Sequence, residues 1–424
     1  PGAGRILLWL LALLLMLCSM ERQVGHATCR SIADLSTQGA YGVADVDGRI
    51  VDSCNVDRPL VPASVLKIAT VSAALAILGP DHRFRTEFYL DDRDNLYLKG
   101  FGDPTLVAEE IVDICEQLRL KGLRRVQTLY VDPSAFALTM QVPGQEDSDN
   151  PYDAPVGPLS VNFNSVPIDK DAAGRIVSGE AVTPTLPIMT ELAKSRPAGR
   201  FRVNICAKGC NPDARMAQYA GELFRALLQQ GGTPVAALGG IRPVPAQGAR
   251  LFYTRQSRQT LTEVSRSTLQ YSSNFMANLM FLACGAKEFG YPATWKKAEQ
   301  AVHRELARQL GGSGSEAIVQ VEGAGLSRDN RVTARVMLQL LTRFRPQLEL
   351  LKKEHGAAVK TGTLTGVYNL AGYLPGGQAF VVLLNQQVNN RAAVLDRLIR
   401  QFGGAPSAPS RQTVSVGPRA GTEK

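Results

Sequence analysis

The pattern of hydrophobic and polar positions in the first hundred residues predicts short strands around one helix. Polar and apolar residues alternate over residues 38–52 with a turn signal at Asp47-Gly48, which predicts a β-hairpin. A helical pattern follows over residues 64–78, and strand-like alternation returns at 83–90 and 95–98. The chain therefore begins as a mixture of helix and strand.

The middle of the chain continues the mixture and adds long loops. A helix is predicted over residues 106–121 and a strand over 126–131, which together form an α/β unit. Residues 143–158 are rich in Pro, Asp and Gly and are expected to be loop. The pattern is weak over residues 166–217, as in a small subdomain or extended insert, and a helix is predicted at 214–230.

The last part of the chain is helical first and strand-like afterwards. A short strand and a Pro-rich connector end near residue 249, and helical patterns dominate residues 261–310. Strand patterns occupy residues 357–373 and 379–388, and a helix is predicted over 390–402. No internal repeat is visible.

The two ends of the sequence differ from the rest. Arg5 precedes an apolar run at residues 6–17, and small residues lie before a plausible cleavage point after residue 27. The run is short for a bilayer span, which favours a signal peptide over residues 1–27 and export, with an uncleaved anchor as the alternative. Residues 404–424 are rich in Gly, Pro and Ser and are expected to be a disordered tail.

Seven cysteines agree with export, because an oxidising compartment permits disulfides. Spacing alone does not fix their pairing. Cys206 and Cys210 would close a short loop, and Cys29 and Cys54 bracket a hairpin. Cys115 and Cys284 can simply be buried thiols. The absence of a Cys-x-x-Cys motif and the presence of only four histidines disfavour a zinc site, so neither metal nor cofactor is expected.

The net charge of +9 suits an anionic partner such as a cell-wall polymer or envelope lipid, and hence peripheral envelope association. A dispersed, solubilising surface charge explains the same number equally well. Nucleic acid is disfavoured, because no basic run or known binding motif is present.

Three short motifs carry candidate chemistry. Ser64 and Lys67 form an S-x-x-K at a predicted helix start, where spacing of three places both side chains on one face. A nucleophilic serine needs a nearby base, and a neutral lysine can serve. Ser272 and Asn274 form an S-x-N between helices, and Lys360 opens a K-T-G at a strand start.

Each motif is weak alone, but their order on helix, inter-helix loop and strand matches the set shared by β-lactamases and penicillin-binding proteins. Further segments narrow the resemblance: Gly-Asp-Pro-Thr-Leu at 102–106, Ala-Pro at 154–155, Asn-x-Asn at 162–164 and Gly-Ala-Gly-Leu-Ser-Arg at 323–328. The sequence resembles the low-molecular-mass class C penicillin-binding proteins, the D-Ala-D-Ala carboxypeptidase/endopeptidases, from about residue 29 to 402.

The resemblance implies a role for each motif residue. Ser64 would attack the penultimate D-Ala of a peptidoglycan stem peptide, and Lys67 would be its base. Ser272 and Asn274 would relay protons and hold the substrate amide. Lys360 would add positive potential, and Thr361 would bind the terminal carboxylate of the substrate. Gly362 would let the substrate backbone approach closely. The N–H groups of Ser64 and Thr363 would form the oxyanion hole.

Three more residues are expected to bind the diamino-acid end of the stem peptide, again by resemblance: Asp147, Tyr152 and Arg328. β-Lactam antibiotics would acylate the same serine. The pKa of Lys67, ordinarily about 10.4, must be depressed for it to act as a base; repulsion from Lys360 and burial both act in that direction.

The resemblance also implies a fold and a division of the chain. The fold is expected to be a mixed α/β one, in which an antiparallel sheet flanked by helices, as in serine β-lactamases and penicillin-binding proteins, carries an inserted α/β domain. We expect a peptidase domain at 28–84 and 250–403, an inserted domain at 85–165 and 214–249, and a small inner insert at 166–213. The place of action would be the periplasm.

Other functions are disfavoured by what the sequence lacks. Motifs for an α/β-hydrolase, a zinc protease and a P-loop enzyme are absent. A β-lactamase is the alternative enzyme, and a non-catalytic wall-binding or β-lactam-binding protein is the alternative from another class. The intact set of motif residues argues against an inactive protein.

Overall fold

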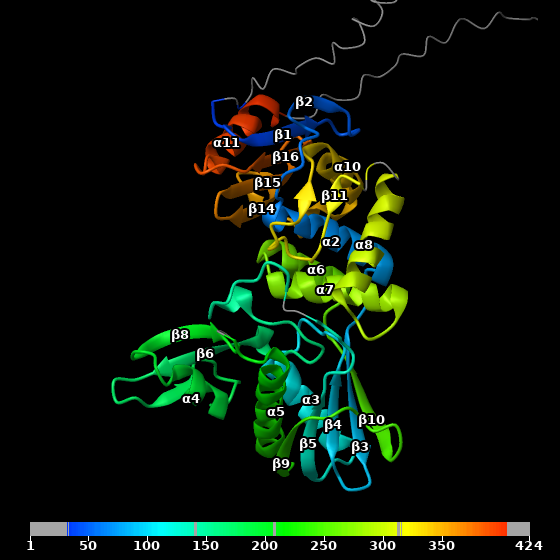
Figure 1. Cartoon of the computed structure of the whole chain (residues 1–424), viewed down its shortest axis with the longest axis vertical. Coiled ribbons are helices and arrows are strands. Elements are labelled where there is room, and N and C mark those ends of the chain that lie inside the picture. The colour runs from blue at the N-terminus through cyan, green and yellow to red at the C-terminus, as the bar shows by residue number, and fades with distance from the viewer. Residues whose placement is uncertain are drawn as a thin grey trace, which may run out of the picture.

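The computed structural model describes residues 32, 34–139, 142–206, 209–311, 314 and 316–404. The predicted signal peptide, and all but the first residue of the predicted tail, lie outside this part of the chain. Figure 1 shows an elongated molecule with a six-stranded sheet at one end, a five-stranded sheet at the other and a smaller three-stranded sheet beside the latter. Across the described residues, no helix combines the length and the apolar character needed to cross a bilayer.

The six-stranded sheet joins the N-terminal hairpin to the C-terminal strands, and all its neighbouring strands are antiparallel. Its order is β13 (Lys352–Glu354), β14 (Ala357–Leu364), β15 (Val367–Tyr373), β16 (Ala379–Leu384), β1 (Gly39–Ala44) and β2 (Ile50–Cys54). The predicted hairpin is present as β1 and β2, and its first strand pairs with β16 from the far end of the chain.

Helices cover both faces of this sheet: α11 (Arg391–Phe402) packs on one face, and α10 (Ala334–Phe344) and the 3-10 helix η1 (Ala63–Leu66) pack on the other. The remaining helices of this part of the molecule pack beyond them: α2 (Lys67–Leu78), α6 (Leu261–Gln270), α7 (Asn274–Phe289), α8 (Trp295–Leu310) and the 3-10 helix η4 (Arg345–Leu350).

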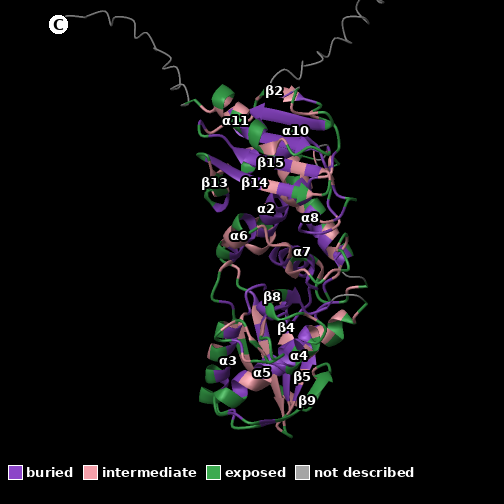
Figure 2. Cartoon of the chain, turned by 90° about the vertical axis from the view of Figure 1, so that its left-hand side faces the viewer, coloured by how far each residue is buried: buried purple, intermediate pink, exposed green. Residues whose placement is uncertain are grey.

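Alternate residues of β16 reach different cores. Phe380 and Val382 pack in the cluster formed with α11, and Val381 and Leu383 pack in the larger cluster that includes α2, α7 and α10. Burial on both faces explains why β16 is apolar throughout instead of alternating. In Figure 2 much of this sheet, around β14 and β15, is accordingly coloured as buried.

The five-stranded sheet is mixed. Its order is β10 (Ala249–Gln256), β3 (Arg85–Asp91), β4 (Leu96–Gly100), β5 (Val126–Asp132) and β9 (Val235–Ile241). β4, β5 and β9 run parallel, which requires crossover connections; α3 (Ala108–Leu120) and α5 (Pro212–Gln230) lie in those connections. β3 is antiparallel to both β4 and β10.

The weakly patterned middle segment forms a three-stranded antiparallel sheet of β7 (Ile176–Ser178), β6 (Ser165–Lys170) and β8 (Gly199–Asn204), accompanied by α4 (Pro187–Ala193). Cys206 and Cys210 form a disulfide just after β8, with Cα atoms 5.6 Å apart. Cys54 is also disulfide-bonded, whereas Cys115 and Cys284 are buried free thiols.

Strand β10 was not predicted: it begins where the expected connector ends, and its residues are exposed or half-buried. It pairs with β3 along its whole length. The domain division remains a prediction, and this pairing favours a boundary after Gln256 over the one expected at residue 250. The mixed α/β fold and the antiparallel sheet flanked by helices are both present.

Candidate active site

Ser64 and Lys67 lie where a helical turn becomes a regular helix. Ser64 belongs to η1, and Lys67 is the first residue of α2, so the side chains share one face as the spacing predicted. The Lys67 Nζ lies 2.8 Å from the Ser64 Oγ. Lys67 is 0% exposed, although most lysines extend into solvent.

Lys67 has two further partners. Its Nζ lies 2.8 Å from Asn274 Oδ1 and 2.7 Å from the carbonyl oxygen of Ala324. Both of these atoms are acceptors only, so they use two N–H groups of the amine. A neutral amine then keeps one lone pair, which faces Ser64 and can accept the hydroxyl proton.

The environment of Lys67 favours this neutral form. Burial lowers the pKa of Lys67 well below its usual 10.5; the positive charge of Lys360 lowers it further, and the negative charge of Glu322 opposes both. Burial is the larger of the two lowering effects, because α2 is enclosed by neighbouring helices.

Ser272 and Lys360 form the second half of the site. The Lys360 Nζ donates to Ser272 Oγ at 2.8 Å and to the carbonyl of Thr361 at 2.7 Å. Lys360 is 2% exposed. Burial, followed by the nearby charge of Arg391, lowers the pKa of Lys360 to about 8.

The S-x-N motif bridges the two halves. Ser272 has a left-handed backbone conformation (φ 55°) in the turn between α6 and α7. Ser273 accepts a hydrogen bond from the N–H of Met276 and so caps α7, which begins at Asn274. This local structure places Ser272 beside Lys360 and Asn274 beside Lys67.

Strand β14 approaches η1 so closely that only glycine fits at the contact. A Cβ on Gly362 would lie 2.8 Å from the carbonyl oxygen of Pro62 and 3.1 Å from the amide nitrogen of Ser64. Asn369 of β15 donates to the Val61 and Pro62 carbonyls, at 2.8 Å each, and holds this segment against the sheet. The backbone around Ser64 therefore faces that of the K-T-G strand.

The three residues expected to bind the diamino acid lie on two neighbouring loops. Tyr152 is 59% exposed, and its carbonyl accepts a 3.4 Å hydrogen bond from Asn274, which places it beside the site. A Cβ on Gly144 would lie 2.4 Å from the Cα of Ser327, so the loop of Asp147 packs against that of Arg328. Arg328 donates to the carbonyl of Thr365 at 2.6 Å.

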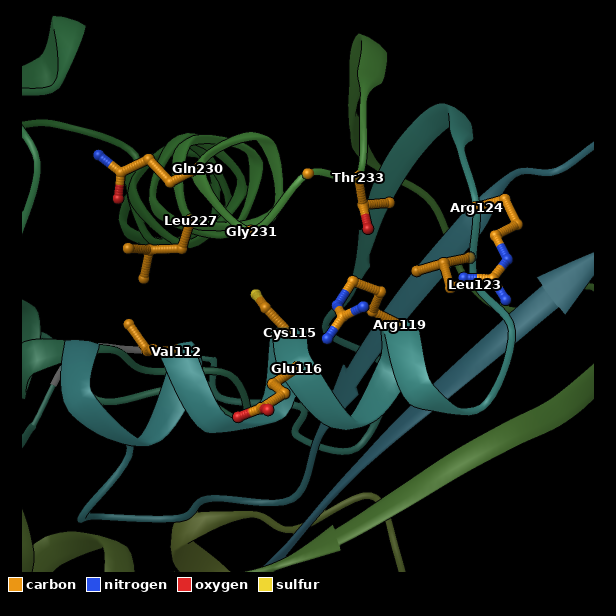
Figure 3. Close-up of a pocket in the computed structure, with 11 residues that line it drawn as sticks. Val112, Cys115, Glu116, Arg119, Leu123, Arg124, Leu227, Gln230, Gly231 and Thr233 are labelled. Atoms are coloured by element: carbon orange, nitrogen blue, oxygen red, sulfur yellow. The ribbon is translucent and has the colours of Figure 1, made fainter.

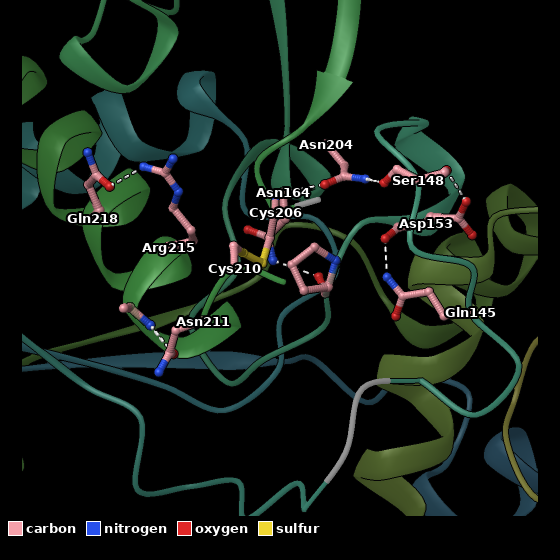
Figure 4. The surroundings of a disulfide bond; sticks show 12 residues. Gln145, Ser148, Asp153, Asn164, Asn204, Cys206, Cys210, Asn211, Arg215 and Gln218 are labelled. Atoms are coloured by element: carbon pink, nitrogen blue, oxygen red, sulfur yellow. Dashed lines mark hydrogen bonds between the residues drawn. A yellow bond between two sulfur atoms is a disulfide. The ribbon is translucent and has the colours of Figure 1, made fainter. Parts of the chain in front are cut away.

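The three-stranded sheet supports the loop of Tyr152. Asn204, at the end of β8, donates to the carbonyls of Ser148 and Asn150 and accepts from the N–H of Cys206 (2.7 Å). Figure 4 shows Asn204 between the disulfide and Ser148. The weakly patterned segment is thus connected by hydrogen bonds to the rim of the site.

Arg391 and the backbone carbonyl of Ala324 were not predicted as parts of the site. Arg391, at the start of α11, donates to Thr363 Oγ1 at 2.9 Å and lowers the pKa of Lys360. The Ala324 carbonyl accepts from Lys67. A backbone carbonyl has no side-chain signal, and Arg391 lies outside any motif, so only the fold identifies them.

A cavity of about 660 Å³ lies elsewhere, between α3 and α5 at the five-stranded sheet (Figure 3). Cys115 is among its lining residues, and burial raises the pKa of this thiol to about 12, which makes it unreactive. None of the motif residues lines the cavity. The size of this cavity therefore does not link it to the reaction at Ser64 and Lys67.

In the part of the chain that the structure describes, no cluster of three His, Cys, Asp or Glu side chains could hold a metal ion.

Comparisons with known proteins agree with this geometry. A family model described as the D-Ala-D-Ala carboxypeptidase 3 (S13) family matches residues 34–203 and 213–354. The D-alanyl-D-alanine carboxypeptidase of Actinomadura sp. (strain R39) is 29% identical over 84% of this chain and 79% of its own. The D-alanyl-D-alanine carboxypeptidase DacB of Haemophilus influenzae is 23% identical over 80% and 83%.

A solved structure extends the comparison to the fold. The crystal structure of penicillin binding protein 4 (dacB) from Haemophilus influenzae superposes with a TM-score of 0.72 at 20% identity, covering 89% of this chain and 99% of that one. The family match spans most of the chain and includes Ser64, Lys67, Ser272 and Asn274. The chain therefore belongs to the D-Ala-D-Ala carboxypeptidase 3 (S13) family, the low-molecular-mass class C penicillin-binding proteins.

Proposed function

We propose that this chain hydrolyses D-Ala-D-Ala peptide bonds of peptidoglycan stem peptides through an acyl-enzyme on Ser64. The observation that carries the proposal is the buried Lys67 Nζ at 2.8 Å from Ser64 Oγ, in an environment that lowers the lysine pKa. A nucleophile and its base within hydrogen-bond reach are what such catalysis requires.

The proposed reaction has two steps. Lys67 takes the proton of the Ser64 hydroxyl, and Oγ attacks the carbonyl carbon of the penultimate D-Ala. The N–H groups of Ser64 and Thr363 stabilise the resulting oxyanion. Lys67 returns the proton through Ser272 to the departing amine, the C–N bond breaks, and water later hydrolyses the serine ester.

The other half of the site would bind the substrate. Lys360 would attract the terminal carboxylate while Thr361 donates to it, and Asn274 would hold the peptide amide. The hydrogen bond from Lys360 to Ser272 supports a shared role in proton relay. Asp147, Tyr152 and Arg328 would bind the diamino-acid end, supported by the packing of their loops beside the site.

We further propose export to the periplasm after removal of residues 1–27, acylation by β-lactam antibiotics, and peripheral envelope association through the net charge of +9. The relative from Haemophilus influenzae has been solved in complex with a β-lactam, which supports the second of these.

Product analysis tests the activity directly. The purified protein should release D-Ala from a stem pentapeptide, and wall fragments digested with it would show whether cross-links are cleaved too. Rapid turnover of penicillin without release of D-Ala would favour a β-lactamase. Binding without any product would favour a non-catalytic protein.

Replacing Arg328 or Asp147 with alanine should impair recognition of the stem peptide. Loss of a hydrogen bond to a charged group should lower kcat/KM for a stem pentapeptide by about 10- to 100-fold. A small D-Ala-D-Ala substrate without the diamino-acid end should be almost unaffected. Arg308→Ala, on the exposed side of α8, is the control; equal losses on both substrates would contradict the prediction.

Replacing Gly362 with alanine should damage the approach of β14 to Ser64. The new Cβ would meet the Pro62 carbonyl at 2.8 Å, so the strand or η1 must shift. A displacement on this scale at reacting groups can cost about 100-fold in acylation rate. Gly221→Ala in α5 is the matched control, because its Cβ would make only ordinary contacts, the nearest 3.6 Å away. Normal acylation by Gly362→Ala would refute the close-approach argument.

A further inference from the structure

Glu322 is a buried carboxylate to which the proposed reaction gives no role. It is 0% exposed and precedes the Gly-Ala-Gly-Leu-Ser-Arg segment. Its Oε1 accepts from the N–H groups of Gly325 (2.7 Å), Leu326 (2.7 Å) and Ser327 (3.3 Å), and its Oε2 from that of Ala324 (2.6 Å). The side-chain amide of Asn330 adds a fifth donor, at 2.7 Å.

Five N–H donors on two oxygens match an ionised carboxylate, which only accepts hydrogen bonds. The arrangement fixes the backbone over residues 322–327 as a rigid turn. Other side chains hold the same turn: Thr70 donates to the Gly323 carbonyl at 2.6 Å, and Asn278 accepts from the Gly323 N–H at 2.7 Å.

The turn touches the reacting residues at two points. The Ala324 carbonyl accepts from the Lys67 Nζ at 2.7 Å. Gly325 has φ +83°, and a Cβ there would lie 2.0 Å from the carbonyl oxygen of Ala63, the residue before Ser64. Ala63 itself has a left-handed backbone (φ 47°), which the packing must hold in place.

We propose that Glu322 is a positioning residue for catalysis: its carboxylate holds the turn that aims the Ala324 carbonyl at Lys67 and supports the backbone before Ser64. It also places a buried negative charge beside the base. The inference rests on the proposed role of Ser64 and Lys67 and adds a residue to it.

The negative charge of Glu322 shifts the pKa of Lys67 in a defined direction. The charged groups that face Lys67 are Lys360 from β14 and Glu322 from the turn, while α7 contributes the uncharged Asn274. Glu322 raises the pKa of Lys67, against burial and Lys360. Glu322 thus keeps Lys67 basic enough to take a proton.

Two substitutions separate geometry from charge. Glu322→Gln removes the charge. Its side-chain oxygen would accept the four hydrogen bonds that Oε1 of Glu322 accepts. Its amide N–H₂ group would then replace Oε2 and face another donor, the N–H of Ala324. Acylation by benzylpenicillin should slow by about 10- to 100-fold, because the base is misplaced. Without the negative charge, the pH inflection of acylation should move lower. Glu322→Asp keeps the charge but is shorter, so its rate should fall about tenfold with the inflection unchanged.

Asp91→Asn is the matched control. Asp91 also accepts backbone N–H groups in a turn, those of Arg93 and Asn95, but in the five-stranded sheet. Its acylation rate and inflection should equal those of the unaltered protein. Acylation rates from pH 5 to 10 and melting temperatures are measured for the unaltered protein and for the three variants.

The outcomes are separable. An inflection that stays or rises in Glu322→Gln, or a normal rate, overturns the proposal. If that variant does not fold, Glu322→Asp carries the test, and a normal rate there overturns it. Failure of the unaltered protein to release D-Ala or to be acylated would instead refute the proposed function, whatever the variants do.

Discussion

Benzylpenicillin is expected to form a stoichiometric adduct on Ser64 that persists far longer than a β-lactamase would allow. Acylation by a β-lactam uses the same nucleophile and base as the peptide. Deacylation requires an activated water, for which class A β-lactamases use a separate glutamate in a Glu-x-x-x-Asn loop. Intact-protein mass spectrometry over time would measure the adduct.

This chain lacks that glutamate in the required place. Between the S-x-N and K-T-G motifs, none of the seven glutamates has asparagine four residues later: Glu288, Glu299, Glu305, Glu316, Glu322, Glu349 and Glu354. Glu322 is near Lys67, but its oxygens already accept five hydrogen bonds. Glu146 and Asn150 have the Glu-x-x-x-Asn spacing, but they precede the S-x-N motif instead of following it. In addition, the side-chain amide of Asn150 donates to Ser148 and Tyr152.

Ser64→Ala is the control for the adduct. It should abolish the adduct and lower D-Ala release by on the order of 10⁴-fold or more. Rapid destruction of penicillin by the unaltered protein would overturn the peptidase assignment in favour of a β-lactamase.

The pH profile of acylation is expected to be bell-shaped and to depend on both lysines. The rate should rise as Lys67 loses its proton, since only the neutral amine can accept one. It should fall as Lys360 loses its charge near pH 8, the value to which its pKa is lowered. Stopped-flow acylation from pH 5 to 10 would measure both limbs.

Lys360→Ala should move the rising limb to higher pH. Removing a positive charge lessens the repulsion on protonated Lys67, so the pKa of Lys67 rises. The falling limb should vanish, and the maximal rate should drop by about 100- to 1000-fold through loss of positive potential at the substrate carboxylate. Lys67→Ala should lose on the order of 10²- to 10⁴-fold.

Arg391→Ala provides the comparison, because Arg391 lowers the pKa of Lys360. Its falling limb should move to higher pH while its rising limb stays near that of the unaltered protein. A rising limb unmoved in Lys360→Ala would rule out the coupling between the lysines. A flat profile would remove Lys67 as the base.

The sequence by itself determined the local elements and the chemistry they carry. The hairpin ending at Cys54, the helix of Lys67 and the strand of Lys360 follow from alternation, helical periodicity and turn residues, which act over a few positions. The spacing of Ser64 and Lys67 places them on one face of any helix. The order of the three motifs along the chain then narrows the protein families to which the chain can belong.

Only the tertiary structure decided what depends on distant segments. β10 joins β3, and β1 joins β16, through backbone pairing that no local pattern encodes. The Ala324 carbonyl reaches Lys67 because Glu322 orders its turn, and a carbonyl leaves no trace in residue type. Lys67 owes its lowered pKa first to enclosure by neighbouring helices, a property of packing that the spacing of charges along a chain does not contain.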